Sequence, residues 1–241
     1  MVEKVDILVF SVHPDDAELS CSGTIAKHIA AGMKIAMVDF TTGDLGTRGT
    51  PETRIIEAEA SAKILGLSAR ENLHFRDGFF KNDEEHQKKI IQVIRKYQPE
   101  IVLANAVEDR HPDHGRASQL TEEACFYSGL RRVETKDRNG NIQDAWRPKA
   151  IFNYIQDRYI EPDFVVDISD YWDVKEASIR AFKSQFFDPS NTEPISYIST
   201  PEFMGFIKAR SQEMGHKIGV KHGEGFTKSK MLEVKNLFDI L

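Results

Sequence analysis

The first 130 residues alternate short apolar runs, rich in residues that favour β-strands, with longer segments of helical periodicity. We expect strands at residues 5–12, 34–40, 72–75 and 101–105, and helices at residues 17–31, 51–65, 83–97 and 115–128. Strands that alternate with helices in this way are typical of successive βαβ units, which build a parallel sheet. The pattern therefore predicts an α/β fold with an open, mostly parallel sheet and helices on both faces.

We interpret the remaining residues, 131–241, as a C-terminal elaboration of the same domain. Residues 131–148 are charged and contain an Asn-Gly turn signal, so we expect an exposed excursion there. Two more strands are expected at residues 150–155 and 164–168, followed by helices at residues 171–185 and 201–215. Because no internal repeat or linker divides the sequence, one domain over residues 1–241 is the economical interpretation.

Composition narrows the classes of protein that this chain can belong to. The net charge of −6 over 241 residues argues against sequence-independent binding to nucleic acid. No apolar run approaches the roughly 18 to 20 residues of a membrane-spanning helix, and the N-terminus lacks the features of a signal peptide. Cys21 and Cys125 match no disulfide or zinc-ribbon spacing. We therefore expect a cytoplasmic protein that acts on a small polar molecule, with no nucleic-acid or membrane partner.

Two polar clusters follow expected strands. The first is HPDD at residues 13–16, and the second is EDRHPDHG at residues 108–115. In an open doubly wound sheet, ligands bind beyond the carboxyl ends of the strands, at the point where the strand order reverses. If the first and fourth strands are neighbours, as in the order 3-2-1-4-5, both clusters converge on one crevice.

Together the clusters supply histidines and carboxylates suited to a metal centre: His13, His111, His114, Asp15, Asp16 and Asp113. Two histidines and one carboxylate suit catalytic zinc, which takes about three protein ligands and lowers the pKa of a water molecule towards about 7. A further carboxylate can act as general base, and a further histidine can stabilise an oxyanion or protonate a leaving amine. Because amide hydrolysis needs these parts, the clusters indicate metal-dependent hydrolysis. Ferrous iron accepts the same ligands.

Each cluster also has a simpler interpretation. A single His-Pro-Asp segment is usually a turn, in which proline fixes φ and aspartate caps the following helix. Here two such segments each follow an expected strand, precede an expected helix and pair histidine with aspartate. This repetition favours the metal centre, in which Asp113 can still cap its helix or orient a histidine.

Several segments resemble one family of enzymes. HPDDAE at residues 13–18 and HPDHG at residues 111–115 are similar to the motifs of the PIG-L/LmbE-like zinc N-deacetylases, which act on N-acetylglucosaminyl conjugates. TTGDLGTRGT at residues 41–50 and GVKHGE at residues 219–224 resemble the bacillithiol-biosynthesis branch of that family. The resemblance extends over nearly the whole chain and implies a Rossmann-like fold.

The resemblance also implies a role for each residue of the two clusters. The implied metal ligands are His13, Asp16 and His114. Asp15 is the implied general base. His111 is implied to stabilise the tetrahedral intermediate, and Asp113 is implied to orient the His111 ring. The bound metal is expected to be zinc or ferrous iron.

The substrate implied by the resemblance is N-acetylglucosaminyl-malate, which is cleaved to acetate and glucosaminyl-malate. Arg54 and Arg110 are implied to contact this substrate, and His222 is implied to contact it from the rim of the site. The negative charge of malate gives the two arginines a physical task, because guanidinium groups bind carboxylates through two hydrogen bonds. The family also suggests a homo-oligomer.

Other functions remain open at the level of the sequence. The nearest alternative is a deacetylase of a different N-acetylated sugar conjugate. Two histidines and one carboxylate also form the facial triad of non-haem iron oxygenases, although those enzymes commonly use a β-barrel. A non-catalytic protein could keep the same pocket to bind a metal or a sugar without turnover.

Overall fold

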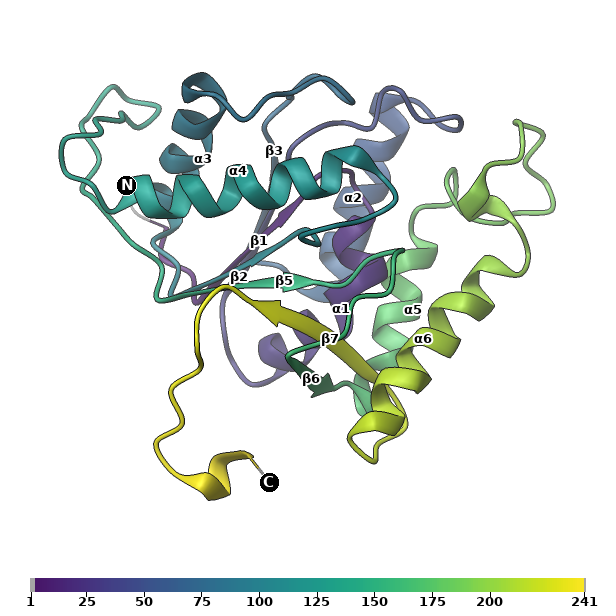
Figure 1. Cartoon of the computed structure of the whole chain (residues 1–241). Coiled ribbons are helices and arrows are strands. Elements are labelled where there is room, and N and C mark those ends of the chain that lie inside the picture. The colour runs from purple at the N-terminus through teal and green to yellow at the C-terminus, as the bar shows by residue number, and fades with distance from the viewer. Residues whose placement is uncertain (1–2, 241) are drawn as a thin grey trace.

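A seven-stranded sheet forms the centre of this computed structural model, which describes residues 3–240 (Figure 1). Its strands are β1 (Ile7–Ser11), β2 (Ile35–Asp39), β3 (Ala69–Asn72), β4 (Ile101–Ala104), β5 (Ala150–Tyr154), β6 (Phe164–Asp167) and β7 (Gly223–Lys228). They lie in the order β3-β2-β1-β4-β5-β7-β6. The pairs among the first five are parallel, whereas β7 runs antiparallel to both β5 and β6. The expected α/β fold and the expected neighbours, β1 and β4, are thus confirmed.

Helices cover both faces of the sheet. They are α1 (Asp16–Ala30), α2 (Pro51–Leu65), α3 (Glu84–Tyr97), α4 (Pro112–Ser128), α5 (Trp172–Arg180) and α6 (Phe203–Lys217). Helices α3 and α4 lie on one face, and α1, α2, α5 and α6 lie on the other (Figure 1). Within residues 3–240, no helix combines the length and the apolar character needed to cross a bilayer.

The central strand β1 explains why helices cover both faces. Its residue Leu8 packs in one apolar cluster with Leu120 of α4, and its neighbour Val9 packs in another with Ile25 of α1. Successive side chains of a strand point to opposite faces, and all five residues of β1 are buried. A strand buried on both faces reads as a continuous apolar run, which is the pattern that marked it in the sequence.

A third apolar cluster joins the helices beside the candidate site. Trp172 and Ile179 of α5 pack with Ala58 of α2 and with Phe203 and Ile207 of α6. This packing places the start of α6 next to the carboxyl ends of the parallel strands, so that the C-terminal part of the chain contributes a wall of the pocket described below.

Some element boundaries differ from the expectations. Strand β3 covers Ala69–Asn72 instead of residues 72–75. This segment contains the charged residue Arg70, which hides the strand in the sequence. In the fold, Arg70 forms ion pairs with Asp39 and Glu18, so the charge is compatible with a strand there. Helix α4 begins at Pro112, three residues earlier than expected, because the His111 side chain caps its first turn.

Helix α5 and strand β7 differ more strongly from the expectations. Helix α5 ends at Arg180, because Ser184 turns to donate two hydrogen bonds to the carboxylate of Glu57. Strand β7 was not expected, since its sequence GEGFTK contains two glycines and one large apolar residue. Its Glu224 accepts hydrogen bonds from main-chain N–H groups of α1, which anchors the strand to the helix.

The segment at residues 131–148 is the mostly exposed excursion that its charge predicts. An isolated bridge between Lys136 and Ile142 closes it, and Gly140 occupies the turn with φ of 83°. Arg95 of α3 ties the base of this segment to the body by donating hydrogen bonds to the main-chain oxygens of Leu130 and Val133.

Candidate active site and metal centre

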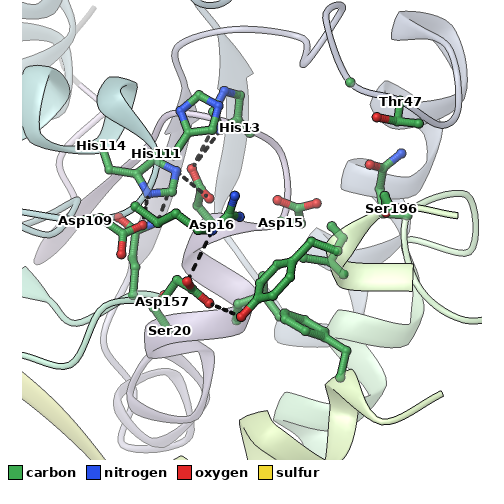
Figure 2. Close-up of a pocket in the computed structure, with 18 of the residues that line it drawn as sticks. His13, Asp15, Asp16, Ser20, Thr47, Asp109, His111, His114, Asp157 and Ser196 are labelled. Carbon is green, nitrogen blue, oxygen red and sulfur yellow. Dashed lines mark hydrogen bonds and ion pairs between the residues drawn. The ribbon is translucent and has the colours of Figure 1, made fainter. Parts of the chain in front are cut away.

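The turn between β1 and α1 carries the first half of the candidate site (Figure 2). The main-chain N–H of His13 donates to Asp16 Oδ2 at 2.9 Å, which closes the turn at the start of the helix. Between them, Asp15 takes the N-cap position with φ of 127°. A non-glycine residue in such a sparsely populated conformation costs about 1–3 kcal/mol and is found mainly at functional sites.

The loop after β4 and the first turn of α4 carry the second half. His114 Nε2 lies 3.2 Å from Asp16 Oδ1, and its Nδ1 lies 2.5 Å from Asp109 Oδ2. A carboxylate on one ring nitrogen fixes the orientation of the ring and leaves the other nitrogen to face a ligand. Because β1 and β4 are adjacent and parallel, the two polar clusters converge as the sequence predicts.

The Asp16 carboxylate lies between two histidines. Its Oδ2 is 3.4 Å from His13 Nδ1, and its Oδ1 faces His114. Two groups of candidate ligand atoms lie within 4.8 Å of one another: those of His13, His111 and His114, and those of His13, Asp77 and Asp113. Ring nitrogens and carboxylate oxygens are ligands of zinc and of ferrous iron, so the donor set fits either metal.

The pKa values in this cluster favour a bound cation. Burial lowers the pKa of His13, but hydrogen bonds and charges from Asp16 and Asp77 outweigh burial and raise it to about 10. Burial lowers the pKa of His114 too, and Asp16 and Asp109 raise it to about 9. Burial raises the pKa of Asp16, but the two histidines hold it well below its usual value. A divalent cation could replace the two protons, because ligand histidines must be deprotonated to bind it.

Asp15 is buried beside this cluster, with 4% of its surface exposed. Burial raises its pKa to about 7, against the opposing positive charge of Arg54. The two terminal nitrogens of Arg54 donate to Asp15 Oδ2 at 3.1 Å, to the main-chain oxygen of Pro14 and to that of Gly43. Arg54 therefore holds the Asp15 turn in place, and Asp15 is a base whose pKa lies near neutrality.

The ring of His111 is oriented by the main chain. Its Nδ1 accepts a hydrogen bond from the N–H of Asp113 at 3.3 Å, so the proton of the neutral ring lies on Nε2. Burial and two positive neighbouring histidines lower the pKa of His111. The carboxylate of Asp113, which was expected to orient the ring, instead accepts hydrogen bonds from the N–H of Gly78 and from Arg116. The reason is that His111 caps α4 and thereby receives a main-chain donor.

Arg110 lies at the rim of the site, with a side chain that is 53% exposed. Its Nε donates to Asp157 Oδ2 at 3.2 Å, and its guanidinium lies 4.5 Å from the centre of the Tyr197 ring. The hydroxyl of Tyr197 donates to the same carboxylate at 3.0 Å. Loops from the C-terminal part of the chain thus complete this rim.

A cavity of about 340 Å³ connects these residues. Of the expected site residues, Asp113 and His222 do not line it. The ring of His222 is fully buried and stacks on Trp172, with centroids 4.5 Å apart. The structure therefore does not bring His222 to the rim, because the chain after α6 enters the sheet as β7 instead of forming a loop.

Sequence reasoning did not assign four residues that shape the site: Asp77, Asp109, Asp157 and Tyr197. Asp77 Oδ1 lies 3.0 Å from His13 Nε2, and Asp109 orients His114. Both follow strands of the parallel sheet, so the rule that located the two clusters places them at the same edge, although it does not show which histidine each one contacts. Asp157 and Tyr197 come from segments with no local signal.

The fold and the site define an α/β protein with a candidate metal centre and a buried base at the carboxyl edge of a mostly parallel sheet. A model of the PIG-L family, described as GlcNAc-PI de-N-acetylase, matches residues 8–125. Diacetylchitobiose deacetylase of Thermococcus kodakarensis is 32% identical over 190 residues, which cover 75% of this chain and 70% of that relative. The chain belongs to the PIG-L/LmbE family of deacetylases.

Two further relatives show the range of this similarity. The 4-oxalmesaconate hydratase of Pseudomonas putida is 29% identical over 193 residues, which cover 74% of this chain and 73% of the hydratase. The crystal structure of a conserved protein from Thermus thermophilus superimposes with a TM-score of 0.83 at 34% identity, over 96% of this chain and 98% of that one. The proteins to which this chain is similar thus include both deacetylases and a hydratase, so the fold alone does not define the reaction.

Proposed function

We propose that this protein is a metal-dependent N-deacetylase that removes the acetyl group from an N-acetylglucosaminyl conjugate. The observation that carries this proposal is the position of Asp15, a buried carboxylate with a pKa of about 7 that lines the same cavity as the histidine cluster. A base of this pKa next to a metal centre is the arrangement needed to activate water for attack on an amide.

His13, Asp16 and His114 would hold the metal, which we propose to be zinc or ferrous iron. The Asp16 carboxylate contacts both histidine rings. A further carboxylate contacts each ring: Asp77 contacts His13, and Asp109 contacts His114. When bound, such a metal polarises an acyl oxygen and lowers the pKa of a water molecule.

The residues of the chain then divide the remaining chemistry. Asp15 accepts a proton from the attacking water, and Arg54 keeps its carboxylate directed into the cavity. His111 presents its Nε2–H to the negative charge that develops on the acyl oxygen, while its Nδ1 is fixed by the main chain. Cleavage of the C–N bond needs a proton on the leaving nitrogen, which the protonated Asp15 can return.

We propose N-acetylglucosaminyl-malate as the substrate, which would place the protein in the bacillithiol branch of the family. We also propose that it acts in the cytoplasm. A cavity of about 340 Å³ is large enough for a sugar conjugate, and arginines in its lining suit the carboxylates of malate. We also propose that the chain is a single domain and that it works as a homo-oligomer.

The experiment is to measure free-amine release from N-acetylglucosaminyl-malate and from N-acetylglucosamine, with protein stripped of metal and then refilled with zinc or ferrous iron. We expect metal-dependent turnover that favours the malate conjugate. Equal turnover of both substrates would retain the deacetylase and reject the malate assignment. Hydration of 4-oxalmesaconate without amine release would instead favour the reaction named for the Pseudomonas relative, and oxygen consumption would favour an oxygenase.

A further inference from the structure

Four arginines line the cavity, and three of them are engaged by protein acceptors. Arg54 and Arg110 make the contacts given above, and Arg210 donates to the main-chain oxygen of Asp157. Arg48 differs, because its guanidinium makes no hydrogen bond or ion pair with any residue in the described range, 3–240. Only 4% of its surface is exposed, and its Nε is buried without a partner.

A buried guanidinium without an acceptor destabilises the fold, because no hydrogen bond or ion pair compensates for the loss of its hydration. The positive charge of Arg48 contributes to lowering the pKa of Asp188, but the hydrogen bonds of that exposed carboxylate come from Ser190. No ion pair joins Arg48 to Asp188 within the described residues. An anionic ligand in the cavity would supply the missing acceptor.

The loop that carries Arg48 is held firmly between β2 and α2. The main-chain oxygen of Arg48 accepts a hydrogen bond from Gln185 Nε2 at 2.7 Å. The N–H of Gly49 donates to the carboxylate of Glu193 at 3.1 Å, and Thr50 caps α2. The unpaired charge is therefore part of an organised segment, which reduces the cost of ordering it when a ligand binds.

Arg48 lines the cavity next to Thr47, in the loop between β2 and α2. Its neighbour Thr47 lies across the cavity from His13 and His114, with Asp15 between them (Figure 2). An acetamide placed at the histidine cluster would therefore leave the rest of the conjugate to extend towards the loop of Arg48.

We propose that Arg48 is the residue that binds the acidic group of the substrate and thereby selects anionic sugar conjugates. This inference rests on the proposed deacetylase function for the identity of the sugar. It moves the task of anion recognition away from Arg54, whose two terminal nitrogens are already bound, and from Arg110, which is paired with Asp157. Among the four pocket arginines, Arg48 is the one whose guanidinium makes no hydrogen bond or ion pair with the described residues.

The test compares Arg48→Gln with the wild type on two substrates that differ in charge. These are N-acetylglucosaminyl-malate and methyl N-acetylglucosaminide, each assayed with metal-loaded protein. A hydrogen-bonded ion pair contributes about 1.5–3 kcal/mol, so kcat/KM for the acidic substrate should fall roughly 10- to 100-fold, mainly through KM. Turnover of the neutral substrate should stay unchanged. Arg132→Gln, on the exposed excursion, is the matched control and should affect neither substrate.

Two further measurements separate binding from structure and from turnover. The melting temperature of ligand-free Arg48→Gln should equal or exceed that of the wild type, because an unpaired buried charge has been removed. Calorimetric titration of N-acetylglucosaminyl-malate into metal-free protein should show weaker binding to Arg48→Gln, whether or not the enzyme turns the ligand over. If the wild type binds this ligand in an Arg48-dependent way but releases no acetate, the deacetylase proposal fails and the role of Arg48 stands.

Three outcomes would overturn the role of Arg48. The first is an equal loss of activity on both substrates together with a lower melting temperature, which would indicate a structural residue. The second is no change with either substrate. The third is binding of N-acetylglucosaminyl-malate to the wild type that is absent, or no tighter than its binding to Arg48→Gln.

Discussion

Asp15 combines a strained backbone, a buried carboxylate and a pKa raised to about 7. None of these features helps the stability of the fold, since each has an energetic cost. They persist because Arg54 binds both the carboxylate and the preceding main-chain oxygen. The combination supports the role of general base that we propose for Asp15, which is distinct from the role proposed for the metal ligands.

Asp15→Asn should retain bound metal and lose most of its turnover. Asparagine keeps the shape of the side chain but cannot accept a proton, and general-base catalysis contributes about 10²- to 10⁴-fold. The measurement is amine release alongside metal content by atomic absorption. His114→Ala is the contrasting variant and should lose the metal. Full activity of Asp15→Asn would show that the base is another residue.

The histidines should make the stability of the metal-free protein fall with rising pH. The pKa values of His13 and His114 are raised from 6.5 to about 10 and about 9. A raised histidine pKa stabilises the folded state fully below pH 6.5, and this contribution is lost as the pH rises through 9 to 10. The melting temperature in a chelator should therefore decline between pH 7 and pH 10. The double variant His13→Gln with His114→Gln should decline less, and an equal decline would refute this assignment.

The two clusters could be predicted from the sequence because their residues follow strands of a parallel sheet, where a general rule places ligands. Contacts across the fold could not be predicted. No local pattern shows that Asp77 faces His13, or that the Arg48 guanidinium lacks an acceptor. His222 was expected at the rim because residues 219–224 resemble a family motif. In the structure this segment leads into β7, and the His222 ring is buried against Trp172.

Strand β7 is the element that connects the two halves of the chain. It lies between β5 and β6, and its Glu224 accepts hydrogen bonds from the N–H groups of Gly23 and Thr24 in α1. The same carboxylate pairs with Lys175 of α5 at 2.6 Å, and both side chains are at least 97% buried. One carboxylate thus fixes two helices to the sheet behind the catalytic turn.

Glu224→Gln should destabilise the protein by about 3–5 kcal/mol, because it leaves the charge of Lys175 buried without a counter-ion. The measurement is the free energy of unfolding in urea. The double variant Glu224→Gln with Lys175→Met should recover part of the loss, since it removes the orphaned charge. Glu84→Gln breaks the exposed pair with Lys88 and should change the stability little. Similar effects of Glu224→Gln and Glu84→Gln would contradict this interpretation.

The elements that were predicted well are marked by hydrophobic periodicity or by capping residues within their own sequence. Helix α2 begins at Pro51 after its Thr50 cap and ends at Leu65, before the C-cap Gly66, whose φ is 79°. The elements that were misplaced depend on partners far away in the chain. Strand β3 tolerates Arg70 because of Asp39 in the neighbouring strand, and β7 contains glycines because its neighbours leave no room for a Cβ at Gly223.

At the scale of the whole molecule, the proposed metal centre joins segments that are far apart in the sequence. His13 and Asp16 follow β1, whereas His114 belongs to α4. A metal that binds all three in the folded state, and binds poorly to the unfolded chain, must stabilise the fold by mass action.

Zinc at a free concentration 100-fold above its Kd should stabilise the protein by about 2.7 kcal/mol, which corresponds to about 5 to 11 °C in a domain of this size. Thermal unfolding of chelator-treated protein, before and after zinc is added, measures this shift. His216→Gln, an exposed histidine near the end of α6, should retain it. His114→Ala should abolish it, and an undiminished shift in that variant would place the metal elsewhere.

The position of β7 also sets the order in which a ribosome can complete this protein. Strand β6 reaches the sheet only through β7, so it has no partner until residues 223–228 have been translated. The hydrogen bond between Gly23 and Glu224 spans 201 residues. The N–H of Gly23 in α1 therefore lacks this acceptor until Glu224 has been translated. A nascent chain that stops short of β7 exposes the edge of β5 and an unpaired Lys175, which are features that promote aggregation. A chain truncated before β7 would therefore fold poorly even though it keeps both polar clusters of the candidate site.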